Sequence, residues 1–314
     1  MGAVTLAESA KLSQDKMVKG VIEVMLKESP ILTKLPFETI VGNALLMNRE
    51  DPDNMGSVHF RGVDDVLTQS TAKFNQATFS LTSLIGDADV PNLIQRSRSN
   101  VNDQMGVQVK IKSKLMAYEF ENCFVYGDNT SSNEFSGLHK LVATAGASRN
   151  LSMSSGSDTT GGPLTIEALD QLIDSVEGGS PDILLMNKAI RRRLSQKLRA
   201  LGSYQTERDD YGNYWVIWNG VPIGVTDFIV QTEAITTGQF SGKTGSNTSS
   251  VFAFRFGEGD GVTGIQNGGI ETEVWERLEV KDAMRTRLKW YCGLALYSPL
   301  AVARISGVTD AAMA

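Results

Sequence analysis

The feature that most constrains the fold is a regular alternation of apolar and polar residues near the C-terminus. Every second position between 286 and 296 is apolar: Leu288, Trp290, Cys292, Leu294 and Leu296. This is the period of a β-strand with one buried face. The preceding stretch, 271–287, is also expected to be extended, but its charges lie on both faces and do not suit the core of one subunit. A long C-terminal strand pair, half apolar and half charged, favours a subunit that continues its contacts into neighbours over a compact enzyme.

The bulk properties describe an ordinary globular chain. Its 314 residues suffice for one large domain or two modest ones, and 41% are apolar. We expect no membrane span, because no run of about 18 apolar residues occurs, and no secretory signal at the N-terminus. Cys123 and Cys292 are expected to be small buried apolar groups in a reducing cytoplasm. The net charge of −6 argues against a protein that grips nucleic acid, but it suits a container along whose wall DNA slides.

The first 90 residues predict a helix followed by a hairpin. Ser13 is the expected N-cap of a helix that ends at Ser29, with this apolar stripe: Met17, Val18, Val21, Ile22, Met25 and Leu26. The apolar segment 31–37 has no clear period, and one interpretation is a helix packed on its own domain. Residues 57–61 and 72–84 are candidate strands of a long hairpin, which needs a cover because two strands alone are marginally stable.

The middle of the chain predicts a long helix and then alternating elements. Apolar residues recur every three or four positions from Pro91 to Tyr126, which predicts one helix over this range. A Ser/Gly-rich loop, a helix over 165–176 and a buried strand over 182–186 are expected next. Asn187 is expected to cap a further helix, whose polar faces carry several arginines and lysines. We interpret these charges as solvated or intersubunit groups in preference to a nucleic-acid patch, because the whole chain is acidic.

The sequence offers no group that we can assign to catalysis, a cofactor or a metal. Gly259, Gly261 and Gly264 match the dinucleotide pattern, but the glycines that follow cannot begin the helix which that pattern requires, so we expect a turn between strands. His59 and His139 are expected in loop or edge positions without a cysteine or second histidine nearby. We therefore expect a protein that is not an enzyme.

Two stretches resemble the major capsid proteins of tailed bacteriophages, the family with the HK97-type shell fold. One is Gly-Gly-Ser-Pro-Asp-Ile-Leu-Leu-Met-Asn-Lys-Ala-Ile-Arg from Gly178. The other runs from Gly269 through Trp-Glu-Arg at 275–277 to Ser-Pro and Ala-Arg-Ile-Ser-Gly at 303–307. The resemblance implies an α+β fold of the HK97 type. The implied parts are an N-terminal arm and helix (1–47), an extended hairpin loop (48–90), a peripheral domain with a spine helix (91–180), an axial domain (181–268) and return strands completing the peripheral domain (269–314).

The resemblance implies a structural subunit of a virion. Copies would form pentamers and hexamers of an icosahedral shell around double-stranded DNA, assembled in the host cytoplasm with a separate scaffolding protein, a portal and a decoration protein as further partners. The N-terminal arm and the extended loop would lie on neighbouring subunits. The residues we expect at intersubunit contacts are Arg61, Lys73, Phe74, Arg191, Arg192, Glu279, Asp282 and Arg285. Lys73 is also the candidate donor for a cross-link between subunits, although an ordinary surface lysine is the more economical interpretation.

Two other interpretations stay open. The same fold serves encapsulin-type nanocompartments, which load protein cargo and should carry an apolar groove on the lumenal surface. A soluble α+β enzyme or binding module would instead be a compact low oligomer with a concave apolar pocket.

Overall fold

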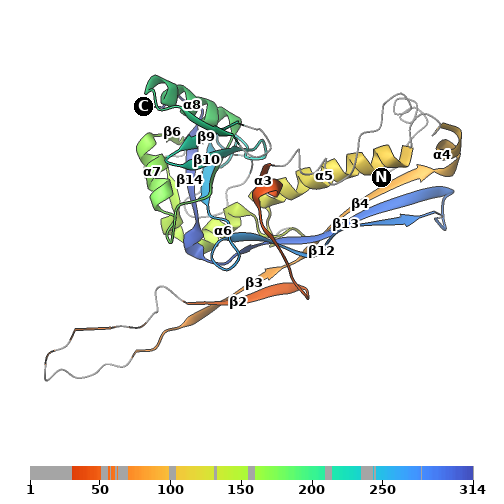
Figure 1. Ribbon diagram of the computed structural model, residues 1–314, viewed down its shortest axis with the longest axis horizontal. Coiled ribbons are helices and arrows are strands. Elements are labelled where there is room, and N and C mark those ends of the chain that lie inside the picture. The colour runs from red at the N-terminus through yellow and green to blue at the C-terminus, as the bar shows by residue number, and fades with distance from the viewer. Residues whose placement is uncertain are drawn as a thin grey trace.

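The computed structural model describes residues 30–50, 56, 58–60, 62, 70–98, 104–130, 133–154, 160–208, 214–234, 243, 245–276 and 278–313. The helix expected over 13–29 and the candidate contact residue Arg61 lie outside these ranges. Figure 1 shows an elongated molecule: a lobe of mixed helices and strands at one end, a long platform of strands beside α5 (Gln104–Tyr126), and a hairpin that projects away from both. In the described part of the chain no helix is long and apolar enough to cross a membrane.

The platform is a four-stranded sheet in the order β1-β12-β13-β4. Its strands are β1 (Phe37–Thr39), β4 (Thr82–Pro91), β12 (Val262–Trp275) and β13 (Ala283–Leu296). β13 is antiparallel to both of its neighbours. The alternation predicted near the C-terminus is confirmed, because Leu288, Trp290, Cys292, Leu294 and Leu296 are all at most 3% exposed. Between β12 and β13 the chain turns, so the charged stretch 271–287 forms the end of a hairpin.

Helix α5 packs on this sheet through aromatic side chains. The ring of Phe120 lies 4.8 Å from that of Trp290 on β13 and 5.9 Å from that of Phe37 on β1. The sequence predicted one helix from Pro91 to Tyr126. The structure instead has α4 (Asn92–Arg98) and α5, with residues 99–103 outside the description.

The second lobe is built on a larger sheet in the order β5-β14-β11-β7-β10-β9-β8, with β6 paired to β14. Its strands are β5 (Asn150–Ser152), β6 (Gly162–Pro163), β7 (Ile183–Met186), β8 (Gln205–Arg208), β9 (Tyr214–Trp218), β10 (Val221–Val225), β11 (Ser249–Phe254) and β14 (Val302–Thr309). Its helices are α6 (Leu138–Ala145), α7 (Ile166–Asp174) and α8 (Lys188–Ala200), with short 3-10 turns at 147–149 and 299–301.

Local signals in this lobe are confirmed. Asn187 caps α8 by accepting a hydrogen bond from the Ala189 amide, as expected. The helix expected over 165–176 is α7, and Thr165 caps it by accepting a hydrogen bond from the Ala168 amide. The sheets do not follow the ranges expected for the domains: β5 and β6 from 91–180 lie in the second sheet, and so does β14 from the return strands 269–314. β14 pairs with β11 inside the second sheet, where all of its residues except Thr309 are buried.

The projecting hairpin consists of β2 (Ala44–Glu50) and β3 (Phe74–Ser80) (Figure 1). The strands predicted at 57–61 and 72–84 are therefore partly wrong. Val58–Phe60 are not in a strand, and the second range spans β3 and the start of β4. Near the outer end of the paired strands, the half-buried Arg49 donates a hydrogen bond of 2.8 Å to the carbonyl of Leu296, the last residue of β13. Local strand propensity could not reveal this pairing, because strand partners are chosen by cross-strand contacts.

The segment after Pro30 packs on its own chain. It forms α3 (Pro30–Lys34) and β1, and Ile31 and Leu35 are 1% and 5% exposed within the same core as Phe120. β1 pairs in parallel with β12. The arm implied for residues 1–47 is therefore corrected over 31–39, where α3 and β1 belong to the fold of their own subunit, as the alternative interpretation of 31–37 had it.

Candidate assembly surfaces

The hairpin β2–β3 exposes apolar side chains that its own subunit does not cover. Leu46 is 61% exposed and Phe74 is 67% exposed, on opposite strands. Beyond the two strands, Val58 and Phe60 are fully exposed. The hairpin packs on the platform through Leu45, Met47 and Phe79, so Leu46 and Phe74 are the apolar side chains that it leaves for another surface. The expected contact residues Lys73 and Phe74 lie here, at the beginning of β3.

A second exposed surface lies where β12 and β13 are connected. Val280 is 90% exposed, and Leu93 at the beginning of α4 is 70% exposed beside it in the lining of an open cavity of about 590 Å³. Asp282 holds this end together, because its carboxylate accepts a hydrogen bond of 2.6 Å from the Asn92 side-chain amide. Glu279, also a predicted contact residue, is exposed in the same connection. The structure thus brings Glu279 and Asp282 to one surface.

The charged half of β13 is neutralised by β4 within the chain. Arg285 donates two hydrogen bonds to the Asp89 carboxylate, of 2.6 and 2.8 Å, and Arg287 does the same to Asp87, with 2.6 and 2.7 Å. These bonds hold the pKa of both aspartates below the usual value, against the opposing effect of burial. The contact between subunits expected for Arg285 stays a prediction, since its guanidinium already has a partner in its own subunit.

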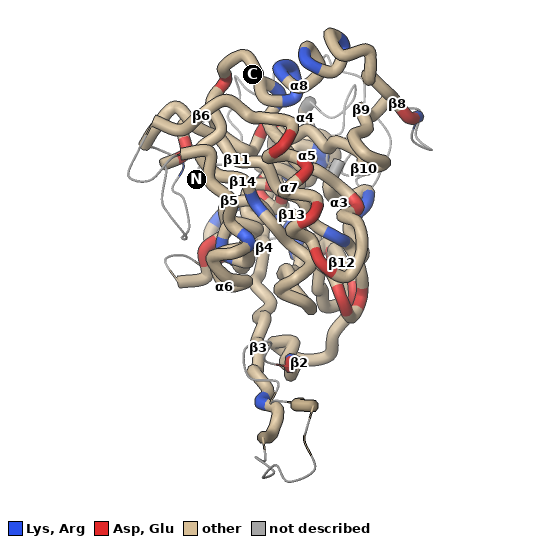
Figure 2. The backbone as a smooth tube through the Cα atoms, turned by 90° about the vertical axis from the view of Figure 1, so that its left-hand side faces the viewer, with Lys and Arg blue, Asp and Glu red and all other residues tan. Residues whose placement is uncertain are grey.

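Basic residues gather on α8, at the end of the molecule far from the hairpin (Figure 2). Two of them are tied to the C-terminal end of the chain, because Asp310 accepts from Arg193 at 2.6 Å and from Arg192 at 3.1 Å. Arg191 on the same helix is half-buried. A nucleic-acid patch would need free guanidinium groups, so these contacts favour the interpretation of structural charges. Contacts of Arg191 and Arg192 with other subunits stay predictions.

A sealed polar cluster joins the two parts of the molecule. Glu233, which is 1% exposed, contacts four side chains. They are Tyr126 at the end of α5, His139 on α6 at 3.1 Å, Ser250 on β11, and Arg304 on β14 at 3.6 Å. Arg304 also donates to the Ser250 hydroxyl at 2.9 Å.

The charges in this cluster follow from its burial. Burial, with the positive Arg304, lowers the pKa of His139 to about 4, so the imidazole is neutral at neutral pH. Burial alone would raise the pKa of Glu233, but its hydrogen-bond partners and Arg304 hold it below the usual value. The cluster is therefore an ion pair between Glu233 and Arg304. The neutral side chains of Tyr126, His139 and Ser250 hydrogen-bond to the Glu233 carboxylate and orient it. His139 had been predicted in a loop or edge position, which is wrong: it is completely buried, and no local signal in the sequence reveals this.

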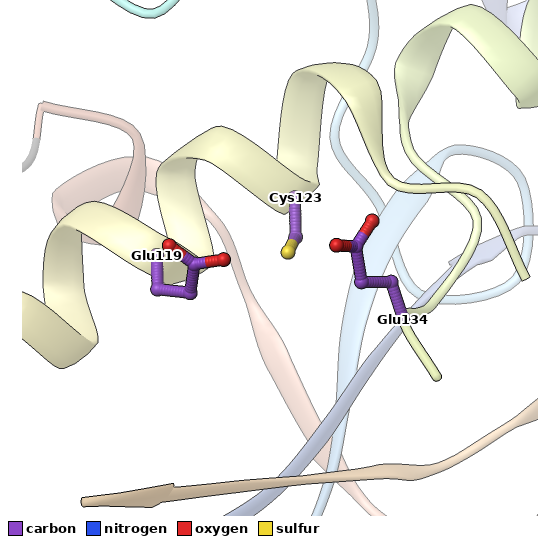
Figure 3. A group of neighbouring side chains, drawn as sticks. All are labelled: Glu119, Cys123 and Glu134. Carbon is purple, nitrogen blue, oxygen red and sulfur yellow. The ribbon is translucent and has the colours of Figure 1, made fainter. Parts of the chain in front are cut away.

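Within the described part of the chain, one group brings three possible metal ligands together. Glu119 and Cys123 of α5 point toward Glu134, and their ligand atoms lie within 4.8 Å of one another (Figure 3). Burial, with the negative Glu134 and Glu119, raises the pKa of the Cys123 thiol to about 12. Because acidic side chains often lie close together without an ion, we assign no metal to this group.

The glycine pattern forms a turn, as expected. Gly259 has a φ of +99° in the connection between β11 and β12, and Gly264 lies inside β12. A strand begins at Val262 where the dinucleotide pattern requires a helix.

The comparisons with known proteins agree with this geometry. Residues 81–237, half of the chain, match the SU10 major capsid protein family. Three solved structures share the fold. An encapsulin chain of the holo-SrpI complex from Synechococcus elongatus aligns over 100% of this chain and 99% of its own, with a TM-score of 0.69 and 15% identity. A capsid chain of the native GTA particle aligns over 94% of this chain and 92% of its own, with a TM-score of 0.59 and 10% identity. A chain from Mycobacterium phage Bobi aligns over 97% of this chain and 98% of its own, with a TM-score of 0.57 and 13% identity. No curated protein matches the sequence.

The fold is that of the HK97-type capsid chains, as the resemblance implied. The family match is more specific than the fold. This chain belongs to the SU10 major capsid protein family. It is a structural protein of the virion, whose copies associate into an icosahedral capsid shell.

Proposed function

We propose that copies of this subunit form pentamers and hexamers that close into a shell around double-stranded DNA. The observation that carries the proposal is the family match over 81–237, together with a hairpin whose apolar side chains its own subunit leaves exposed. Closed shells need heterologous contacts, in which a surface of one copy meets a different surface of the next. The hairpin β2–β3 is one such surface and the connection between β12 and β13 is another.

Several finer points belong to the same proposal. The contacts between subunits would involve Lys73 and Phe74 on the hairpin, and Glu279 and Asp282 at the β12–β13 connection. The enclosed DNA would be held without sequence preference, because the net charge of −6 lets the polymer slide along the wall. A separate scaffolding protein, a portal and a decoration protein would complete the particle in the host cytoplasm. The subunit would have no enzymatic activity.

A protein nanocompartment is the second candidate. The similarity to the SrpI encapsulin chain over the whole of this chain supports it. The two candidates differ in what the shell contains, so the particle's contents discriminate between them.

The first test is electron microscopy and light scattering of the purified protein, with analysis of the contents. Closed particles that form around DNA in the presence of the other phage proteins would support the proposal. Particles that repeatedly enclose one host protein and no DNA would favour the nanocompartment. A monodisperse monomer or dimer at high concentration would contradict both and reopen the enzyme interpretation.

A matched pair of variants tests the hairpin contact. Phe74→Asp places a charge where an apolar contact is expected and should prevent closed particles, because an unpaired carboxylate is costly to bury. Phe74→Leu keeps an apolar side chain and should still assemble. Normal particles from Phe74→Asp would remove Phe74 from the contact.

A further inference from the structure

The chain contains two Asn-Gly pairs, Asn219–Gly220 and Asn267–Gly268. Such a pair can react spontaneously, because glycine has no Cβ and its backbone nitrogen can approach the preceding side chain closely. That nitrogen attacks Cγ of the asparagine and closes a succinimide ring, while the Cγ–Nδ2 bond breaks and ammonia leaves with the amide proton. Water then adds to either carbonyl of the ring and leaves an aspartate or an isoaspartate. The two pairs lie in very different surroundings.

Asn219 is held by its turn and by helix α7. Asn219 and Gly220 form the two-residue connection between β9 and β10, with φ angles of +47° and +79°. Two positive φ angles are the mark of a type I′ turn, which fixes the backbone on both sides of the asparagine. Nδ2 of Asn219 donates a hydrogen bond of 3.0 Å to Oδ1 of Asp170, and Nε1 of Trp218 donates one of 2.8 Å to the same oxygen. Ring closure at Asn219 would have to break its bond to Asp170 and distort the turn.

Asn267 lies where β12 departs from regular pairing. The pairing with β13 is interrupted between Gln266 and Ile270, so three residues of β12 stand opposite one residue of β13. Gly268 and Gly269 both have a φ of +81°, which glycine adopts without strain. Asn267 is exposed, and no group in the described part of the chain hydrogen-bonds to its side chain. Neither a turn nor a side-chain partner therefore holds this asparagine.

An open cavity of about 370 Å³ adjoins Asn267. Its other lining residues are Tyr291 of β13 and the segments 42–43 and 81–83, through which the chain enters and leaves the hairpin β2–β3. The cavity leaves room for the side chain of Asn267 to fold back onto the next peptide group, and it gives water access to the ring that would form. Both steps of the reaction are therefore open at Asn267.

We propose that Asn267 is a site of spontaneous deamidation in the folded subunit, while Asn219 is protected by its turn and by its hydrogen bond to Asp170. The reaction needs only water, and it converts the side chain of residue 267 into an aspartate or an isoaspartate. It does not depend on what the shell contains, so it stands apart from the proposed function.

The product changes the place where the hairpin joins the platform. A carboxylate at position 267 adds negative charge close to Glu271, whose Oε1 lies 3.5 Å from the position that a Cβ on Gly268 would occupy. Isoaspartate also lengthens the main chain of β12 by a methylene group directly after Gln266. The carbonyl of Gln266 accepts a hydrogen bond of 2.9 Å from the Ile40 amide, just before the hairpin. The modification therefore acts on the attachment of the hairpin.

Peptide mapping by mass spectrometry tests the proposal on purified, unassembled subunits. After incubation in mildly alkaline buffer, which favours loss of the amide proton, the peptide with Asn267 should gain the mass difference between an amide and an acid. It should also separate into aspartate and isoaspartate forms. The peptide with Asn219 should convert at least about tenfold more slowly, because its side chain must first leave the carboxylate of Asp170. In denaturant the two peptides should convert at similar rates, since both asparagines precede glycine.

Either of two results in the folded subunit would overturn the proposal. In the first, the peptide with Asn267 keeps its amide although the same peptide converts in denaturant, so the fold does not leave this asparagine free to react. In the second, Asn219 converts as fast as Asn267, so the turn and Asp170 give no protection.

A matched pair of variants on α7 tests the protection of Asn219 separately. Asp170→Ala removes the acceptor for the Asn219 side chain and should speed its conversion several-fold. Asp170→Asn keeps an oxygen that can accept the same hydrogen bond and should leave the conversion slow. Conversion of Asn267 should be the same in both variants as in the wild type. An Asn219 peptide that converts no faster in Asp170→Ala would refute the role given to Asp170. Because particle formation is scored separately by microscopy, failure here leaves the shell function standing.

Discussion

The sealed cluster around Glu233 supports a quantitative prediction. Glu233→Gln keeps the shape of the side chain but removes its charge, leaving Arg304 buried at 1% exposure without a counter-ion. Removing one partner of a buried ion pair costs about 3–5 kcal/mol of unfolding free energy. The amide oxygen can still accept from Tyr126, while the amide NH2 faces Arg304 and Ser250 unfavourably. We therefore expect a loss of about 3 kcal/mol.

The assay is urea unfolding of unassembled subunits, followed by tryptophan fluorescence. The matched control is Asp227→Asn, which removes the carboxylate of an ion pair with Lys188 that is about two-thirds exposed. That variant should cost no more than about 0.5 kcal/mol, because exposed pairs are screened by water.

A double variant separates the ion pair from general disruption. Glu233→Gln with Arg304→Met removes both charges, so it should cost less than the sum of the two single changes by at least about 1.5 kcal/mol. Additive costs, or a Glu233→Gln cost equal to that of Asp227→Asn, would refute the reasoning.

Three further predictions concern pH, capping and close packing. Because the pKa of His139 is lowered from 6.5 to about 4, stability should be complete above pH 6.5 and fall as the pH drops toward 4; melting temperatures should show this, and His139→Gln should reduce the slope. Thr165→Ala should cost about 1 kcal/mol in urea unfolding, whereas Thr165→Ser should cost little. A Cβ at Gly264 would lie 2.5 Å from the Phe37 ring, so Gly264→Ala should cost about 1–3 kcal/mol. A Cβ at Gly86 would lie 3.8 Å from the Cβ of Lys112, so Gly86→Ala should cost less unfolding free energy than Gly264→Ala. Equal costs for the two variants would contradict the packing argument.

Local sequence patterns predicted well those elements whose signals lie inside or next to the element. The helix over 165–176, the cap Asn187 and the strand at 182–186 were visible because their signals lie within a few residues of the element. The same locality explains the errors. Strand β2 was missed because its partner β3 lies more than twenty residues away, and register depends on that pairing.

The functional surfaces were harder to predict than the fold. Phe74, Glu279 and Asp282 were named from the resemblance, and the structure shows that all three are exposed. Glu279 and Asp282 lie together in the connection between β12 and β13. Arg192 and Arg285 were named for contacts between subunits, yet they have partners inside the chain. A charge in a sequence does not reveal which opposite charge the fold brings to it.

The sequence by itself determined the buried face of β13, the helical periods and the family, because each rests on short-range spacing or on residue identity. Only the tertiary structure decided that β14 joins the second sheet, that 31–39 stay in their own subunit, and that His139, Glu233 and Arg304 meet in a sealed site. These residues are separated by dozens of positions. Their contact follows from the packing of α5 and α6 against β11 and β14, which no local period encodes.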